Sequence, residues 1–159
     1  MHLFEQGKLD VLLGFVPEPQ VLRAKKVGHV LLDTGNDRPW SQYFCCLAAG
    51  NREFVRKNPI ATKRALRALL KAVDLCVSQP ENAARVMMNR GIAAEYEYTL
   101  QAMREVGYAK WREFESDYTM RFWSLCLREL GIIKSDPKKL LAQGTDWRFI
   151  NELKKALKT

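Results

Sequence analysis

Three short apolar runs in the first third of the chain predict β-strands. The run at residues 11–16 is apolar at every position but one. An unbroken short run is typical of a strand with both faces covered, as in a parallel sheet beneath helices. Residues 29–32 and 42–48 predict two further strands. Pro17 and Pro19 follow the first run and end it, because proline cannot continue a sheet ladder.

After residue 50 the pattern changes to a helical one. Apolar residues recur at steps of three and four, which places them on one face of an α-helix. Asn58 followed by Pro59 predicts the start of a helix of about 20 residues. Ser78 and Glu81 have the spacing of a capping box for the next helix. The predicted helices are 18–26, 51–57, the one from Pro59, the one ending at Arg90, 94–106, 116–130, a short one after Asp136 and one from about 145 onward.

These elements predict an α/β fold, with short strands in the first third and a helical C-terminal two-thirds. Such an order of strands before helices is a fold-class signal in itself. Three short strands are too few to cover so many apolar helix faces. We therefore expect the chain to be the second half of a larger assembly of secondary structure.

The first strand and the loop at residues 33–43 carry the candidate binding residues. In open α/β sheets, ligands lie beyond the carboxyl ends of the strands. The loop adds aromatic faces and hydrogen-bonding groups, the mixture found in small-molecule sites. The alternatives are a plain core strand that ends in a proline turn, and aromatic residues that only pack at a loop–strand junction. The candidate ligand-binding residues are Phe15, Glu18, Arg38, Trp40 and Tyr43.

Composition indicates a globular chain with a basic surface. The chain is 47% hydrophobic and 28% charged, with a net charge of +8. This charge could attract nucleic acid or another anionic partner, but the basic residues are scattered along helices, which favours a solvated surface and no nucleic-acid partner. No apolar run approaches the roughly 20 residues of a membrane span, so no membrane insertion is expected. The N-terminus lacks the pattern of a secretion signal, which predicts a cytoplasmic product for this chain as written.

Catalytic and metal-binding patterns are absent from the sequence. No nucleophile elbow, phosphate-binding loop or H-E-x-x-H motif occurs. The histidines, His2 and His29, are far apart in sequence. Cys45 and Cys46 are neighbours on a predicted strand, so we expect their side chains to point to opposite faces and not to share a metal readily. We therefore expect no catalytic residue, no metal site, no cofactor and no enzymatic activity.

An ordered set of motifs gives the chain a family resemblance. It resembles the C-terminal half of the NMT1/THI5-like branch of the nitrate/sulfonate/taurine-type substrate-binding proteins of ABC transporters. The motifs are Leu3-x-x-x-Gly7-Lys8-Leu9-Asp10, Gly28-His29-Val30-Leu31-Leu32, Tyr43-Phe44-Cys45-Cys46, Phe54-Val55-Arg56-Lys57-Asn58-Pro59, Gln79-Pro80-Glu81-Asn82-Ala83-Ala84 and Gly144-Thr145-Asp146-Trp147-Arg148-Phe149.

The resemblance implies a partial periplasmic-binding-protein-like (type II) fold. Residues 1–50 would be a remnant of the second lobe with hinge strands, and residues 51–159 a helical region that packs on the first lobe. The implied function is that of a truncated solute-binding component of an ABC importer, which holds a small organic or anionic solute in an interlobe cleft. The implied partner is a transporter permease, and the family's location is periplasmic.

Two other functions remain open from the sequence. One branch of the family synthesises the thiamine pyrimidine precursor and carries a cysteine-rich motif, and Cys45-Cys46 lies where that motif would sit. The residues that would hold its pyridoxal cofactor would lie outside this chain. The second alternative is a basic nucleic-acid interaction module, whose binding would weaken steeply with salt.

The predicted strands generate an expectation about assembly. Open sheet edges and apolar helix faces favour pairing with another chain, so we expect a homodimer or a higher homo-oligomer. Light scattering across micromolar concentrations measures the mass in solution. A monomer at every concentration would contradict this expectation.

Overall fold

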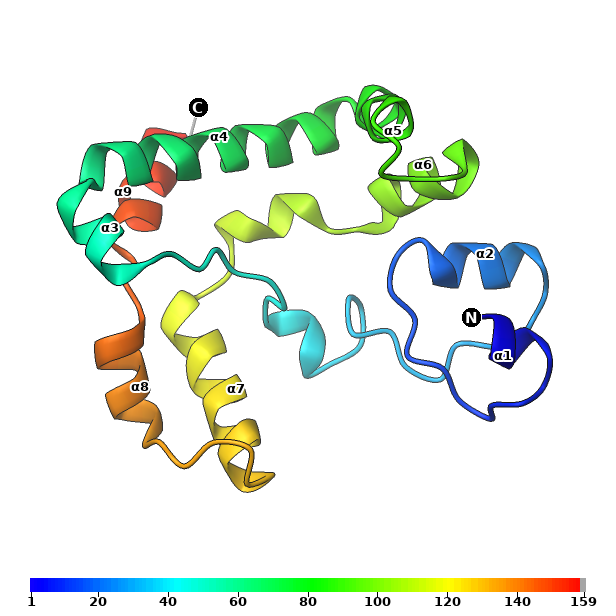
Figure 1. The fold of residues 1–159 in the computed structure, drawn as a ribbon, viewed down its shortest axis with the longest axis horizontal. Coiled ribbons are helices and arrows are strands. Elements are labelled where there is room, and N and C mark those ends of the chain that lie inside the picture. The colour runs from blue at the N-terminus through cyan, green and yellow to red at the C-terminus, as the bar shows by residue number, and fades with distance from the viewer. Residues whose placement is uncertain (158–159) are drawn as a thin grey trace. The chain divides into compact units, whose positions relative to one another are not determined.

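The computed structural model describes residues 1–157, and every regular element in that range is a helix (Figure 1). The predicted α/β fold is therefore wrong. Residues 11–16, 29–32 and 42–48 form no strands in the described chain. A strand needs a neighbouring strand to satisfy its N–H and C=O groups, and within residues 1–157 no such partner pairs with these segments.

The chain divides into two compact units. Unit 1 is Met1–Gly35 with Val73–Ala109, and unit 2 is Asn36–Ala72 with the chain from Lys110 onward. Unit 1 contains α1 (His2–Glu5), α2 (Glu18–Ala24), α5 (Pro80–Asn89) and α6 (Tyr96–Glu105). Unit 2 contains the 3-10 helix η1 (Trp40–Gln42), α3 (Arg52–Lys57), α7 (Ser116–Glu129), α8 (Pro137–Gly144) and α9 (Arg148–Ala156). Both α4 (Pro59–Ser78) and η2 (Tyr108–Arg112) contribute residues to each unit.

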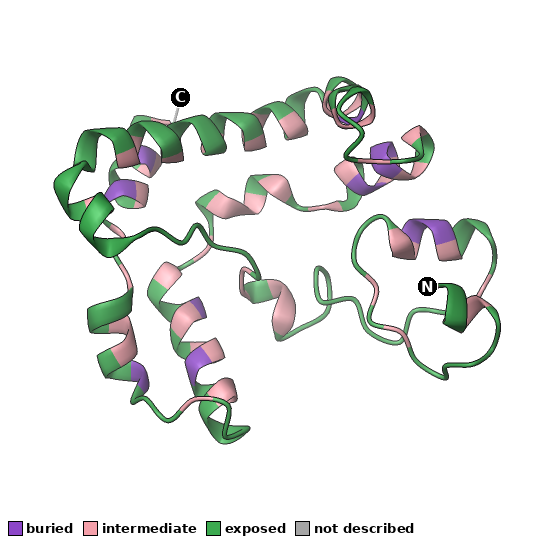
Figure 2. Cartoon of the chain, in the orientation of Figure 1, coloured by how far each residue is buried: buried purple, intermediate pink, exposed green. Residues whose placement is uncertain are grey.

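In unit 1, α6 packs against α2 and α5. The buried apolar residues come from these three helices and are Val21, Ala84, Leu100 and Ala102 (Figure 2). Polar contacts reinforce the packing of α2 on α6. The carboxylate of Glu105 accepts hydrogen bonds from Gln20 Nε2 at 2.8 Å and from the Arg23 guanidinium, and its other oxygen accepts one from Gln101 Nε2 at 2.8 Å.

In unit 2, α7 packs against α8, and α9 supplies the largest buried apolar side chains. Phe149 and Leu153 of α9 are buried, and the exposed fraction of Leu153 is 0%. Thr119 and Ser124 of α7 are also buried. The unit therefore has its own small core.

Two predicted helix starts, at Asn51 and after Asp136, are confirmed, and in each a side chain caps the helix. Asn51 Oδ1 accepts a hydrogen bond from the backbone N–H of Phe54 at 3.0 Å, and Asp136 Oδ1 accepts one from the N–H of Lys138 at 2.8 Å. The capping box predicted at Ser78 is wrong. Helix α4 runs through Ser78, whose hydroxyl donates to the carbonyl oxygen of Asp74 at 2.9 Å.

Helix α4 contains no buried residue. Its large apolar side chains are half-buried or exposed, and the most exposed ones are Ile60, Leu69, Leu75 and Val77. No helix in the described part of the chain has the length and apolar content needed to cross a membrane.

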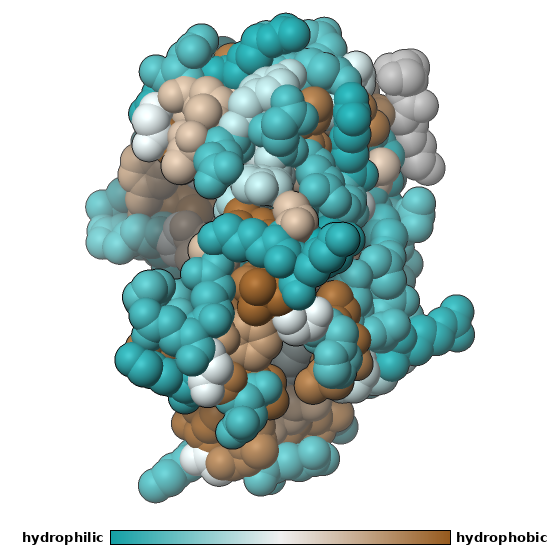
Figure 3. All heavy atoms as spheres, turned by 90° about the vertical axis from the view of Figure 1, so that its right-hand side faces the viewer, coloured by the Kyte–Doolittle hydropathy of each residue, from teal (hydrophilic) through white to brown (hydrophobic). Residues whose placement is uncertain are grey.

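Apolar side chains also remain exposed on the segments that were predicted to be strands. Val11, Leu13, Phe15 and Val16 are exposed, as are residues 30–32. The space-filling view in Figure 3 shows apolar atoms open to the surface on the face that it displays. The expectation of self-association therefore depends on exposed apolar area and no longer on open sheet edges.

Replacing Leu153 by alanine should destabilise unit 2. The side chain is fully buried, so the change removes apolar contacts and leaves a cavity, which costs about 2–5 kcal/mol of unfolding free energy. Urea unfolding followed by circular dichroism measures the loss. Leu130→Ala is the matched control, because Leu130 is 73% exposed and its loss should cost less than about 0.5 kcal/mol. Equal losses in the two variants would contradict this description of the core.

Replacing Glu105 by glutamine should weaken unit 1 and alter its pH dependence. Partial burial acts to raise the pKa of Glu105, but the donors on Arg23, Gln101 and Gln20 outweigh it and hold that pKa below its usual value. A lowered folded-state pKa contributes stability above the unfolded-state pKa, and this stability is lost as the pH falls through the folded-state pKa.

The expected loss at neutral pH is on the order of 1 kcal/mol, because the carboxylate is partly screened by solvent. The unfolding free energy should fall less between pH 7 and a pH below 4 for Glu105→Gln than for the unmodified protein, as urea unfolding curves at the two pH values would measure. Glu53→Gln is the control, since Glu53 pairs with Lys57 on an exposed helix face. An unchanged pH dependence in the Glu105 variant would contradict the prediction.

Candidate functional site

Helix α7 holds the segment that follows η1. The ring of Tyr43 stacks on that of Phe122, with centroids 3.8 Å apart and planes 7° apart. The Tyr43 hydroxyl donates to the Tyr118 hydroxyl at 3.3 Å. This hydrogen bond and, to a lesser degree, burial raise the pKa of Tyr43. Tyr43, a predicted ligand-binding residue, therefore packs against α7.

The next residue is anchored to the same helix. Trp123 Nε1 donates to the carbonyl oxygen of Phe44 at 3.1 Å. The Phe44 ring meets the ring of Phe114 edge to face, at a centroid distance of 6.0 Å. Phe114 lies two residues before α7 begins, so both the start and the body of this helix contact residues 43–44.

The other predicted ligand-binding residues lie in different surroundings. Phe15 and Glu18 belong to unit 1, where Glu18 Oε2 accepts a hydrogen bond from the backbone N–H of Phe15 at 3.0 Å. The Phe15 side chain is 70% exposed. Arg38 and Trp40 belong to unit 2, where Arg38 is exposed and Trp40, half-buried, begins η1. Of these four residues, the structure therefore joins Phe15 and Glu18 by a hydrogen bond.

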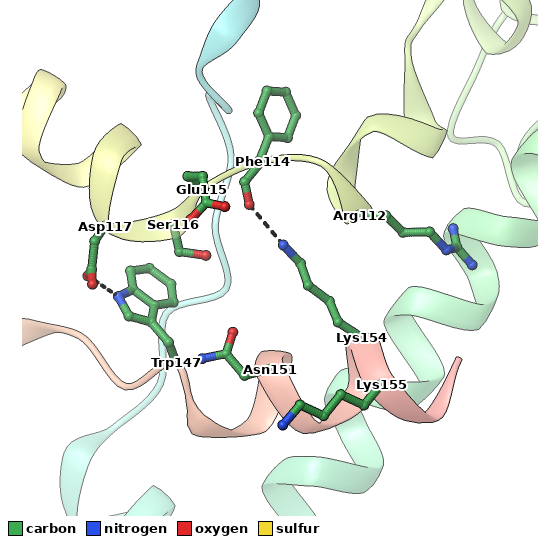
Figure 4. Close-up of a pocket in the computed structure, with 9 residues that line it drawn as sticks. All are labelled: Arg112, Phe114, Glu115, Ser116, Asp117, Trp147, Asn151, Lys154 and Lys155. Carbon is green, nitrogen blue, oxygen red and sulfur yellow. Dashed lines mark hydrogen bonds between the residues drawn. The ribbon is translucent and has the colours of Figure 1, made fainter. Parts of the chain in front are cut away.

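Unit 2 contains a pocket that the sequence analysis did not predict. Its volume is about 550 Å³, within the range of about 300–1,000 Å³ usual for small-molecule sites. Its wall is built from the residues around the start of α7 and from one face of α9 (Figure 4). The lining residues are Arg112, Phe114, Glu115, Ser116, Asp117, Trp147, Asn151, Lys154 and Lys155.

Lys154 is the best-placed cation of this pocket. Its side chain extends from α9 across the pocket, and Nζ donates to the carbonyl oxygen of Phe114 at 2.8 Å (Figure 4). That is its one hydrogen bond among residues 1–157, whereas an ammonium group has three N–H donors. Lys154 is half-buried, and a partly desolvated cation is stabilised by an anionic partner. Two of its donors are available to a ligand.

Trp147 provides the aromatic surface of the pocket. Its indole Nε1 donates to Asp117 Oδ1 at 2.7 Å, which fixes the ring between α9 and the start of α7. This hydrogen bond also engages one of the two lining carboxylates. The amide of Asn151 and the hydroxyl of Ser116 lie beside the indole in the close-up. The pocket thus combines an apolar face, neutral polar groups and an excess of cations.

Unit 1 contains a smaller cavity of about 250 Å³. It lies beside Cys76, Met103 and Tyr108, where the Tyr108 hydroxyl donates to Met103 Sδ at 3.6 Å. Burial raises the pKa of Tyr108 and that of Cys76. This cavity is smaller than usual ligand sites, so the pocket of unit 2 is the better candidate.

The sequence contains a signal that could have revealed the pocket. Trp147, Asn151, Lys154 and Lys155 recur at helical steps, so a helix through them places an indole, an amide and two ammonium groups side by side. The helix predicted from about residue 145 onward contains these residues, but no site was predicted on it. What the spacing alone could not supply is the carbonyl of Phe114, which is 40 residues away and orients Lys154.

The cysteine pair differs from the sequence expectation. Cys45 and Cys46 were expected to point to opposite faces of a strand, but no strand forms and their Sγ atoms lie 3.3 Å apart. Both residues are exposed and reduced. Desolvation, and then the hydrogen bond with the Cys46 thiol, raise the pKa of Cys45.

A comparison with protein-family models identifies the chain's relatives. A model described as the NMT1-like family matches residues 1–89, which confirms the resemblance found in the sequence. No curated protein and no solved structure matches the chain. The matched residues are more than half of the 159-residue chain. The chain therefore belongs to the NMT1-like family.

Proposed function

We propose that this chain acts as a solute-binding component of an ABC importer and binds a small organic anion. The observation that carries the proposal is the family match over residues 1–89. This region includes all five ligand-binding residues expected from the sequence, from Phe15 to Tyr43. A solute-binding protein needs a site but no catalytic group, and the pocket of unit 2 has the volume of such a site.

The charges of the pocket support an anionic solute. Arg112, Lys154 and Lys155 outnumber Glu115 and Asp117 among its lining residues. Asp117 already accepts the indole N–H of Trp147. A carboxylate or sulfonate placed near Lys154 Nζ would receive charge-assisted hydrogen bonds, which are about twice as strong as neutral ones.

The remaining lining residues favour a solute with a planar apolar body. The indole of Trp147 offers a flat surface on which such a body can stack. Ser116 and Asn151 can donate or accept hydrogen bonds at its edges. Among simple compounds, benzoate has the chemistry that matches these three features.

Benzoate should bind to the protein, and Lys154→Met should weaken the binding by roughly tenfold or more. Methionine keeps much of the side-chain volume but loses the ammonium, and one hydrogen bond to a charged group contributes about 1.5–3 kcal/mol. Isothermal titration calorimetry measures the dissociation constant. Benzamide, which is neutral and of similar shape, should bind more weakly than benzoate.

Two further variants make the experiment decisive. Lys134→Met is the matched control, because Lys134 is exposed in unit 2 and does not line the pocket. Lys154→Arg keeps the charge and should retain part of the affinity. If benzoate binding instead depends on Arg38 and Trp40 and not on Lys154, the site lies in the loop predicted from the sequence. If benzoate does not bind at all, the assignment of an aromatic anion is wrong.

A further inference from the structure

Cys45 and Cys46 form an exposed pair of neighbouring thiols in unit 2. Their Sγ atoms are 3.3 Å apart, which is within hydrogen-bonding distance for sulfur. Both side chains are exposed, so a small reagent can reach them. The other two cysteines, Cys76 and Cys126, are each half-buried, and no hydrogen bond to another thiol is found for either within residues 1–157. The pair is therefore the chain's distinctive thiol feature.

The backbone before the pair is held in place. Tyr43 is stacked on Phe122, and the carbonyl of Phe44 accepts the indole N–H of Trp123. These contacts bind the two residues immediately before Cys45 to α7. Fixed neighbours limit the conformations of the pair, which favours a reaction between the two sulfurs over reaction with a distant thiol.

We propose that Cys45 and Cys46 are a redox modification site, at which a hydroperoxide converts the two thiols into a disulfide between adjacent residues. This site is independent of the proposed solute binding. Its sulfurs must approach by roughly 1.3 Å to reach the S–S length of about 2.05 Å.

The reaction is balanced by the reduction of the peroxide. One thiolate attacks a peroxide oxygen, the O–O bond breaks, and the leaving oxygen takes up a proton, giving water when the oxidant is hydrogen peroxide. The product is a sulfenic acid. The second thiolate then attacks that sulfur, the S–S bond forms, the S–O bond breaks, and the departing hydroxide becomes a second water. The two sulfurs supply the two electrons that the peroxide accepts.

The geometry also indicates that the disulfide is easily reduced. Consecutive residues have Cα atoms about 3.8 Å apart across a trans peptide and closer across a cis one. Ordinary disulfides span about 4.4–6.8 Å between Cα atoms. A bond closed at this shorter separation is strained, and strained or exposed disulfides have higher reduction potentials. A monothiol such as glutathione should therefore restore the dithiol.

The test begins with the fully reduced protein and about one equivalent of hydrogen peroxide. Digestion with trypsin should release residues 27–52 as one peptide, because Arg38 is followed by proline. This peptide contains Cys45 and Cys46 and no other cysteine. In mass spectrometry without reductant, we expect it to be lighter by two hydrogen atoms, and glutathione should reverse the change.

Variants separate the pair from the other thiols. The double variant Cys76→Ser/Cys126→Ser keeps the pair and should be oxidised as fast as the unmodified protein. Cys45→Ser and Cys46→Ser should each lose the disulfide within the peptide. In these variants the remaining thiol should form any disulfide roughly tenfold more slowly than the pair does in the unmodified protein, because no neighbouring thiol resolves the sulfenic acid. Circular dichroism checks that each variant keeps its helices.

Phenylarsine oxide tests the thiol geometry without oxidation. It condenses with two close thiols and releases one water, so the unmodified protein should bind one equivalent and either single variant should bind none tightly. Three results would overturn the proposal. In the first, peroxide oxidises Cys76 or Cys126 in preference to the pair. In the second, the main product is a disulfide between separate chains. In the third, the arsenical binds to the pair but peroxide forms no disulfide.

Discussion

The contact between residues 43–44 and α7 is the interaction on which the rest of unit 2 depends. A stacked pair of rings contributes about 0.5–1.5 kcal/mol beyond its buried area, and here Tyr43 makes such a pair with Phe122. The hydrogen bond from Trp123 to Phe44 fixes the next residue. Because residues 36–50 contain only the short helix η1, these side-chain contacts and not a backbone ladder determine where the segment lies.

The same contact connects the two chemical features of the unit. Phe114 packs its ring against Phe44 and offers its carbonyl oxygen to Lys154. The pocket therefore shares one residue with the anchor of the cysteine pair.

Polar contacts are important in unit 1 for a related reason. Its buried apolar residues are few, and two of the four are alanines, which bury little area. The carboxylate of Glu105 compensates by receiving donors from both α2 and α6. The ion pair between Arg104 and Glu81 is more exposed, and such pairs contribute little stability.

The accuracy of the sequence predictions follows the range of the interactions involved. Asn51 and Asp136 were correctly placed at helix starts because a cap needs only the next three residues. The prediction of a strand at residues 11–16 was wrong. An apolar run indicates that a segment is suited to a sheet, but it does not show that a second strand is present to pair with it. The expected orientation of Cys45 and Cys46 was wrong for the same reason, since it assumed the alternation of a strand. The pocket was missed because Lys154 depends on a carbonyl far away in sequence.

Helix α4 has a consequence for how the protein exchanges its amide hydrogens. It extends for 20 residues, contributes to both units and has no fully buried side chain. A helix whose side chains are at most half-buried gains little from tertiary packing and depends largely on its own backbone hydrogen bonds, and isolated helices are only marginally stable in water. Its amides should therefore exchange with deuterium through local openings that leave the two cores intact. The exchange rates of the α4 amides would thus measure local opening. The exchange rates of the Leu100 and Leu153 amides would measure the unfolding of unit 1 and of unit 2.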